Sequence, residues 1–161
     1  MKLLETQKYQ ECQLVAVINA AAYLGQPLVD PKSEEYERLV DLVGARHGSA
    51  IAIRHAVWYL RMILHEITPV TLETVETRVM SGHPVSVTIW AGGVGFHAIL
   101  LTDGTAKGVK AWNLGIKGNK RGFLTWGRLK ELMAAAPAHC RKAEWYSLDP
   151  LKTQNRNSVH S

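Results

Sequence analysis

The stretch Cys12-Gln-Leu-Val-Ala-Val-Ile-Asn-Ala-Ala-Ala-Tyr-Leu-Gly25 decides the fold, and Gln7-Lys-Tyr-Gln-Glu11 precedes it directly. Nothing in it breaks a helix before Gly25, and a glycine there is typical of a helix C-terminus. Its apolar residues are continuous rather than gathered in one stripe, which predicts a helix buried on most sides. Cys12 would then lie in the first turn, where free backbone N–H groups lower the pKa of a thiol.

Composition places the chain among globular proteins. It has 161 residues, of which 47% are hydrophobic and 20% are charged, enough for one domain with its own core. We expect that domain to span residues 1–148, with a polar, frayed tail over 149–161. No apolar run approaches the roughly 18 residues that cross a bilayer, and the first residues lack the apolar core of a signal peptide. The sequence therefore predicts a cytoplasmic protein without a membrane span.

Two cysteines, Cys12 and Cys140, are present, and they form no CxxC motif. This favours free thiols in a reducing compartment over a disulfide framework. The net charge of +5 would suit an anionic partner, but the basic residues are spread along the chain, so we expect no specific nucleic-acid partner. Because the histidines show no ligand spacing at i, i+3 or i+4, the sequence predicts no metal site.

Hydrophobic periodicity and turn residues predict the remaining elements. Helices are expected at 31–43, 50–65, 71–80 and 125–135, with Asp30 and Ser49 capping the first two. Strands are expected at 85–90, where β-branched residues alternate with others, and at 96–102, 109–112 and 141–148, which follow turns or loops. Helices first and an antiparallel meander second predict an α+β domain in two lobes.

This order of elements brings together three residue types with complementary chemistry. Cys12 opens the buried helix, His97 begins one strand behind a glycine turn, and Asn113 follows the next strand. Two adjacent antiparallel strands would hold His97 and Asn113 side by side. A thiolate can then attack a carbonyl, an imidazole can take and return the proton, and an amide oxygen can fix the imidazole tautomer.

In this ordered set, the sequence resembles papain-like cysteine peptidases, and most closely the C39-like peptidases of the bacteriocin-processing type. The stretches that carry the resemblance are Gln7–Gly25, Gly82–Ile89, His97–Leu101 and Val109–Asn113, and the segment Ser49–Leu64 fits the helical part of such domains. Together they span most of residues 7–148. The resemblance implies a papain-like two-lobed fold in which the cysteine helix of the N-terminal lobe packs on the antiparallel meander.

Residue by residue, the resemblance implies that Cys12 is the nucleophile, His97 the base and Asn113 the residue that orients the imidazole. It gives the oxyanion role to Gln7, with Gln10 as a rival, because Gln7 lies about one residue closer to the cysteine than is usual in the family. The implied activity is hydrolysis of a peptide or related amide bond through a thioester acyl-enzyme. The resemblance also implies a peptide or protein substrate and no cofactor.

Several alternatives stay open at this point. Gln13 follows the cysteine where the family often has Gly or Trp, and Asn113 stands where the C39-like branch usually has Asp. The same triad would also serve isopeptide cleavage, deamidation or cell-wall amide hydrolysis. A third possibility is a catalytically inactive papain-like module that binds a protein. Taken singly, Gln7 and Gln10 are ordinary surface residues, a strand histidine such as His97 is more often structural, and Asn113 is a common loop starter.

Overall fold

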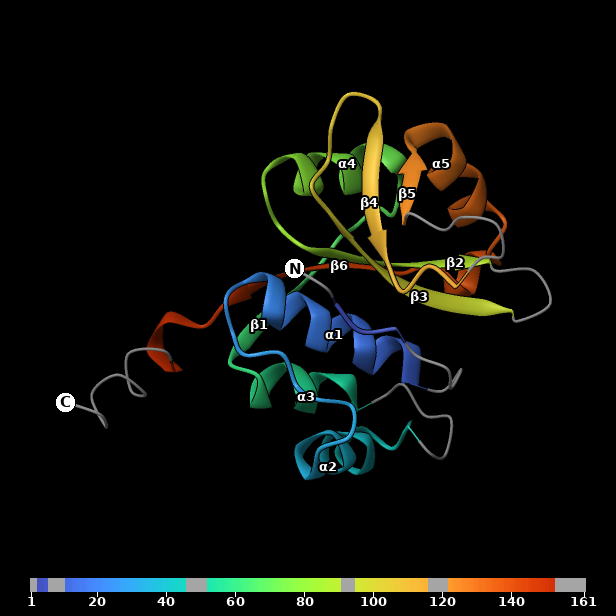
Figure 1. Cartoon of the computed structure of the whole chain (residues 1–161). Coiled ribbons are helices and arrows are strands. Elements are labelled where there is room, and N and C mark those ends of the chain that lie inside the picture. Colours follow the sequence, from blue (N-terminus) through green and yellow to red (C-terminus); the bar gives the residue numbers. More distant parts are fainter. Residues whose placement is uncertain (1–2, 6–10, 46–51, 91–94, 116–121, 153–161) are drawn as a thin grey trace.

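The computed structural model describes residues 3–5, 11–45, 52–90, 95–115 and 122–152. Within them the chain runs through helices and strands in the order drawn in Figure 1. The helices are α1 (Cys12–Tyr23), α2 (Glu34–Val43), α3 (Ile53–Tyr59), α4 (Leu72–Met80), α5 (Trp126–Ala134) and the short 3-10 helix η4 (Ala138–Cys140). The strands are β1 (Met62–Glu66), β2 (Val85–Trp90), β3 (Phe96–Thr102), β4 (Gly108–Trp112), β5 (Phe123–Thr125) and β6 (Ala143–Leu148).

The strands form one antiparallel sheet in the order β1-β6-β2-β3-β4-β5. In Figure 1, α1, α2 and α3 lie on one side of this sheet, and α4 and α5 lie on the other. The domain is therefore α+β, with a helical N-terminal part packed on an antiparallel meander, as the sequence predicts. None of the described helices is long and apolar enough to cross a membrane.

Alternation along the strands divides the apolar residues between two cores, because successive side chains point to opposite faces of a sheet. Leu100 of β3 and Tyr146 of β6 pack with the residues of α1, α2 and α3. Their neighbours Ile99 and Leu101 pack instead with residues of α4 and α5. The sheet is thus covered by helices on both faces.

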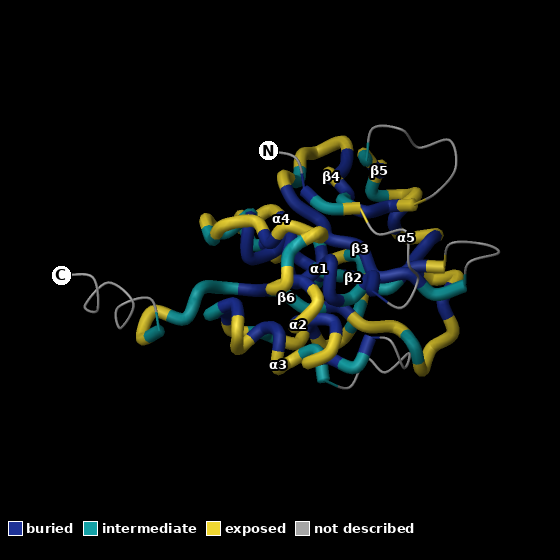
Figure 2. Tube along the Cα trace, turned by 60° about the horizontal axis from the view of Figure 1, so that its bottom comes forward, coloured by how far each residue is buried: buried dark blue, intermediate teal, exposed yellow. Residues whose placement is uncertain are grey.

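Helix α1 is the most deeply buried helix, and Figure 2 shows it as a dark blue segment against β2 and β3. The continuous apolar run in the sequence predicts this burial. Asn19 is the polar exception in its middle, with no exposed surface. Its side chain accepts from the Leu4 N–H at 2.8 Å and donates to the Leu4 carbonyl at 3.0 Å. These two bonds satisfy the buried amide and fix the preceding segment against α1.

The segment that we expected to form one helix over 50–65 is divided in the structure. Helix α3 ends at Tyr59, Arg61 takes a positive φ of 61°, and β1 then begins at Met62. The apolar residues after Leu60 pair in register with β6, from Met62 opposite Leu148 onward. The helix prediction is therefore wrong for its second half, because pairing with a distant strand overrides the local periodicity. The expected cap Ser49 lies outside the described residues.

Two further differences are smaller. Helix α2 begins after Ser33, whose hydroxyl accepts from the Tyr36 N–H at 3.2 Å, so Ser33 and not Asp30 is its N-cap. Asp30 instead accepts from the Lys32 N–H and closes the turn before it. Strand β5 is short and was not expected. The expected strands at 85–90 and 96–102 and the helix capped by Thr71 are confirmed.

Candidate active site

Cys12 is the first residue of α1 and is 8% exposed. The backbone N–H groups of Cys12 itself, of Gln13 and of Ala98 in β3 are close enough to the thiol to lower its pKa. Ala98 is the residue directly after His97. The first turn of α1 therefore lies against the start of β3, and the structure brings the backbone beside His97 to the Cys12 thiol.

The strand register explains why the Ala98 N–H is available. Thr88 of β2 pairs with Ala98, and the Thr88 N–H donates to the Lys142 carbonyl at 3.0 Å, on the opposite side of β2 from β3. Thr88 and Ala98 therefore form a non-hydrogen-bonded pair, and the Ala98 N–H points away from β2, toward the β4 side. Strand β4 pairs with β3 only from Leu100 onward. The edge of β3 at Ala98 is thus left for the thiol.

Burial sets the protonation state of the thiol. It raises the pKa of Cys12 above its ordinary value, and the three backbone N–H groups only partly offset this effect. The helix start alone would favour the thiolate, as the sequence analysis expects, but the loss of water outweighs it. At neutral pH Cys12 is therefore a thiol, and a nucleophilic role requires a base to remove its proton.

His97 is 7% exposed, and its Nε2 lies 2.5 Å from the backbone carbonyl oxygen of Asn113. A carbonyl only accepts hydrogen bonds, so Nε2 must carry a proton. In the neutral imidazole, Nδ1 is then the nitrogen with the free lone pair. Burial lowers the pKa of His97, and the Asn113 carbonyl opposes this only in part, so the ring favours its neutral, basic form.

The backbone of Asn113, rather than its side chain, makes this contact. Asn113 has a φ of 60° and follows β4 directly. Asparagine adopts this left-handed conformation more readily than most residues, and here it turns the carbonyl toward His97. Gly115 also has a positive φ, and a Cβ built on it would lie 3.4 Å from His97 Nε2. The sequence predicts the side-chain amide in this place, whereas the structure places the backbone carbonyl there.

Glu11 is a buried charged residue that sequence reasoning missed. It is the N-cap residue of α1, directly before Cys12, and is 7% exposed. Its carboxylate accepts from the Tyr36 hydroxyl of α2 at 2.8 Å, and burial together with this bond raises the pKa of Tyr36. A carboxylate before an apolar helix suggests an exposed cap. Only the tertiary structure shows that a hydrogen bond from Tyr36 connects the residue before Cys12 to α2.

Gln7 and Gln10, the two candidates for the oxyanion role, lie outside the described residues.

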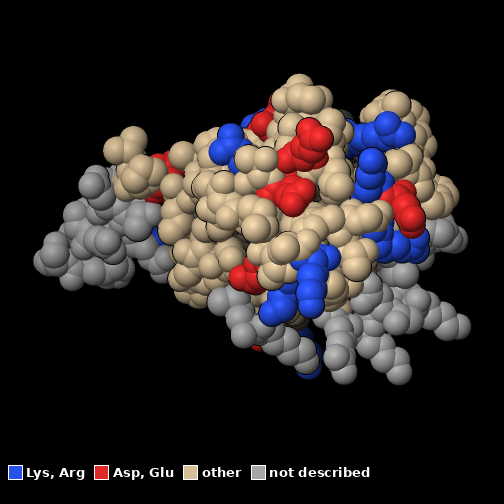
Figure 3. Space-filling view, turned by 90° about the horizontal axis from the view of Figure 1, so that it is seen from above, with Lys and Arg blue, Asp and Glu red and all other residues tan. Residues whose placement is uncertain are grey.

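Both cysteines are free, and Cys140 is more exposed than Cys12. Among the described residues, no group of three or more His, Cys, Asp or Glu side chains is arranged to hold a metal ion. On the face shown in Figure 3, Lys and Arg side chains are interspersed with Asp and Glu.

Two cavities lie near the residues that follow Cys12 and His97 in the sequence. A crevice of about 30 Å³ begins at Gln13 and Ala98, the residues next to Cys12 and His97. It shares Lys142 and Glu144 with a wider cleft of about 620 Å³ that reaches Arg54 and other residues near β1. Burial raises the pKa of Glu144, the carboxylate common to both.

Comparison with known proteins bears on the fold alone. No protein-family model matches the sequence, and no curated protein matches it. The structure is similar to a crystal structure described as a "putative C39-like peptidase from Bacillus anthracis", with a TM-score of 0.61. The match covers 90% of this chain and 93% of the other, at 12% sequence identity. The chain therefore has the α+β papain-like fold.

Proposed function

We propose that the chain is a thiol hydrolase that cleaves a peptide or related amide bond, with Cys12 as nucleophile and His97 as general base. The observation that carries the proposal is the position of the thiol. It lies by the backbone N–H of Ala98, the residue that follows His97 in the sequence, and His97 Nε2 donates to the Asn113 carbonyl. These contacts support a nucleophile, a base and a group that orients the base near the start of α1. The fold shared with a C39-like peptidase adds support.

The chemistry follows from the protonation states. His97 Nδ1 takes the proton of the Cys12 thiol as its sulfur attacks the substrate carbonyl. The imidazolium then protonates the departing amine, which leaves a thioester on Cys12. Water, deprotonated by the same imidazole, hydrolyses the thioester and restores the thiol. Asn113 takes no proton and serves only to hold the ring, in agreement with the neutral carbonyl that contacts it.

The oxyanion of the tetrahedral intermediate needs hydrogen-bond donors. The backbone N–H of Cys12 is one of them, and we propose Gln7 as the second, with Gln10 as the rival. Gln7 leaves enough chain for its side chain to fold back toward the thiol. Removal of such a donor costs on the order of 100-fold or more in turnover. We expect Gln7→Ala to show this loss and Gln10→Ala to remain nearer wild type, measured on the same peptide substrate. A larger loss in Gln10→Ala would reverse the assignment.

The substrate that we propose is a peptide or protein. The crevice at Gln13 and Ala98 and the wider cleft at Arg54 share Lys142 and Glu144 and carry both signs of charge, which suits a chain with polar groups along its length. The crevice of about 30 Å³ is lined by Gln13 and Ala98, the residues after Cys12 and His97, and its small volume favours small substrate residues at the bond to be cleaved. The same geometry would serve an isopeptide bond or a side-chain amide.

The test is turnover of a fluorogenic peptide-amide library by wild type and matched variants. Cys12→Ala should abolish turnover, and His97→Ala should lower it by about 100-fold or more. Cys140→Ala is the matched control and should leave turnover unchanged. All three should keep the wild-type circular dichroism spectrum and melting temperature within a few degrees. Undiminished turnover in Cys12→Ala would refute the proposal.

A papain-like binding module without catalysis is the second candidate, and the burial of the site favours it. Cys12 and His97 are both less than one-tenth exposed, at 8% and 7%. A substrate carbonyl can reach the thiol only if residues near the thiol move aside. If no member of the peptide library is turned over and Cys12 reacts no faster than Cys140, the binding module becomes the better account.

A further inference from the structure

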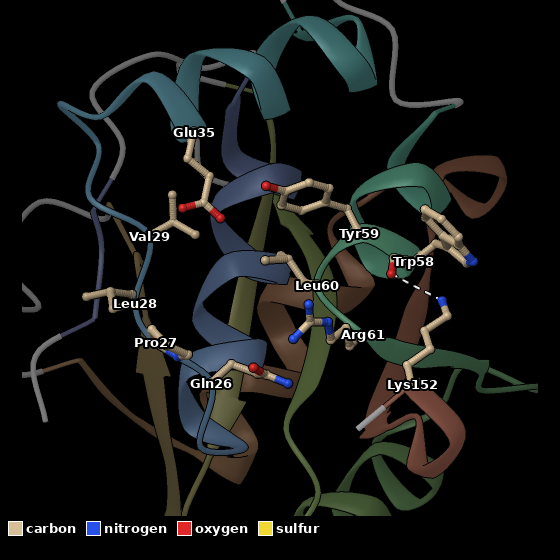
Figure 4. Close-up of a pocket in the computed structure, with 10 residues that line it drawn as sticks. All are labelled: Gln26, Pro27, Leu28, Val29, Glu35, Trp58, Tyr59, Leu60, Arg61 and Lys152. Atoms are coloured by element: carbon tan, nitrogen blue, oxygen red, sulfur yellow. Dashed lines mark hydrogen bonds between the residues drawn. The ribbon is translucent and has the colours of Figure 1, made fainter. Parts of the chain in front are cut away.

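An open cleft lies at the other end of α1 from Cys12 (Figure 4). It is formed by the connector after α1, the first turn of α2, the end of α3 and Lys152. Its volume of about 730 Å³ is in the range of small-molecule sites. Neither Cys12 nor His97 is among the residues that line it. It is therefore separate from the candidate active site.

Arg61 is the unusual residue of this cleft. Its guanidinium points toward the middle of the cleft, with Leu60 on one side and Gln26 on the other (Figure 4). No described residue accepts a hydrogen bond from it or pairs with its charge, and its Nη1 is shielded from solvent. A shielded donor without an acceptor costs free energy, and a charged one costs more. The protein thus holds a guanidinium whose acceptor is not supplied by the described chain.

The backbone holds Arg61 in place. It has a positive φ of 61°, which is uncommon for a residue with a side chain. Its N–H donates to the Trp58 carbonyl at 3.1 Å, and its carbonyl accepts from the Asp149 N–H at 2.8 Å. These two bonds fix the Cα between α3 and β1. The side chain is therefore anchored at the cleft by its neighbours in the chain and by the segment after β6.

The walls of the cleft are largely apolar. Pro27, Leu28 and Val29 form one side, and Leu60 and the aromatic rings of Trp58 and Tyr59 form the other. Leu28, Trp58 and Tyr59 keep 40%, 68% and 43% of their surface exposed, which is high for such residues. Apolar surface of this extent around one cation favours a ligand with an apolar body and an anionic end.

The other charges of the cleft limit the ligand to a single negative charge. Lys152 is already engaged, because its Nζ donates to the Trp58 carbonyl at 3.2 Å, lies over the Trp58 ring and is 4.0 Å from Asp149 Oδ2. Glu35 reaches into the cleft from α2 and would repel a second negative charge (Figure 4). The cleft thus holds the Glu35 carboxylate as well as the Arg61 guanidinium. A ligand with a phosphate dianion is therefore disfavoured relative to a ligand with a single carboxylate.

We propose that this cleft binds a small monocarboxylic acid with an apolar body. The carboxylate accepts from the Arg61 guanidinium in the paired geometry that this side chain favours. The apolar body lies against Val29 and Leu60. Binding satisfies the donors of Arg61 and covers the exposed apolar wall at the same time.

Calorimetric titration of the full chain with octanoate tests the proposal, at concentrations where the acid does not self-associate. Octanoate should bind, and octanol, which has the same apolar body without the charge, should bind at least about 10-fold more weakly. Octyl phosphate should also bind more weakly than octanoate to wild type. In Glu35→Gln that preference for octanoate should shrink, because the repelling carboxylate is gone.

Arg61→Met should lower the affinity for octanoate by about 10- to 100-fold, which is the range for the loss of a hydrogen bond to a charged group. Without ligand it should melt no lower than wild type, because the change removes an unpaired guanidinium and leaves the apolar stem. Arg38→Met, on the exposed face of α2, is the matched control and should not alter the affinity. Equal octanoate affinity in Arg61→Met and wild type would overturn the proposal, as would equal affinity for octanol. Tighter binding of acetyl-Leu-Leu than of octanoate would overturn the small-acid assignment in favour of a peptide C-terminus.

Discussion

At the scale of single residues, the hydrogen bonding of His97 decides which chemistry is open to the site. The Asn113 carbonyl can only accept, so it fixes the proton on Nε2 and leaves the lone pair on Nδ1. The sequence correctly suggests that positions 97 and 113 meet. It cannot show that the backbone makes the contact, because that depends on the φ of 60° at Asn113. A side-chain role and a backbone role look the same in a sequence.

Substitutions at Asn113 distinguish a backbone role from a side-chain role. Asn113→Gly keeps the carbonyl and accepts the positive φ, so we expect turnover to stay within a few-fold of wild type. Asn113→Val keeps the carbonyl but resists that conformation, at a cost of about 1–2 kcal/mol or more. It should lower turnover by about 10-fold or more. If Asn113→Gly is as damaging as Asn113→Val, the side chain orients the ring instead.

The pH dependence of turnover tests the base. Burial lowers the pKa of His97, so the neutral ring that acts as base persists below the ordinary value. Activity should therefore be retained down to pH values under about 6.5 and fall only below that. The measurement is kcat/KM against pH on a peptide substrate whose own groups do not titrate there. An acid limb above the ordinary histidine range would contradict the lowered pKa.

At the scale of elements, β1 is the strand whose nature depends most on a distant partner. Its residues pair with β6, some eighty positions later in the chain, and His65 of β1 stacks on Trp145 of β6 at 3.7 Å. His83 lies on the same Trp145 ring at 4.4 Å, and the Arg78 guanidinium lies over it at 4.5 Å. Two imidazoles and a permanent cation thus share one indole.

This cluster should make stability depend on pH. Burial lowers the pKa of His65 and of His83, and the Arg78 charge lowers both further. The folded state therefore binds these protons less readily than the unfolded state. The stabilisation is present above the unfolded pKa of about 6.5 and is lost as the pH falls below it.

Melting temperatures at about pH 7.5 and pH 5.5, on either side of that value, provide the measurement. The wild type should melt at a lower temperature at pH 5.5 than at pH 7.5. In the double variant His65→Gln, His83→Gln this decrease in melting temperature should be smaller. His139→Gln, at an exposed position, is the control and should behave as wild type. If the melting temperature of the double variant decreases as much as that of wild type, groups other than these two histidines cause the decrease.

Local pattern predicts some elements well and others poorly, for physical reasons. The strands at 85–90 and 96–102 were predictable because β-branched residues lie between glycine turns, and both features act over a few residues. Strand β1 was not, because its apolar residues continue the helical spacing of α3 and only pairing with β6 makes them a strand. The burial of Glu11 against Tyr36 depends on how α2 packs, which no local pattern contains.

At the scale of the whole molecule, α1 links two places of different chemistry. Its first residue is the thiol beside β3, and the segment after its last residue forms a wall of the Arg61 cleft. The sequence indicated the first place, because cysteine, histidine and asparagine follow one another in a recognisable order. It could not indicate the second, because the cleft is assembled from four separate segments. Each single residue in it is ordinary, and only their arrangement leaves the Arg61 guanidinium without an acceptor among the described residues.

The central claim is that His97 activates the Cys12 thiol, and alkylation tests it most directly. Native protein is treated with iodoacetamide at neutral pH, and the labelling rates of Cys12 and Cys140 are compared by peptide mass spectrometry in wild type and His97→Ala. Access alone favours Cys140, since Cys12 is buried and burial raises its pKa. The account predicts that Cys12 nevertheless labels faster in wild type and loses this advantage in His97→Ala. Slower labelling of Cys12 than of Cys140 in wild type, unchanged by His97→Ala, would contradict it.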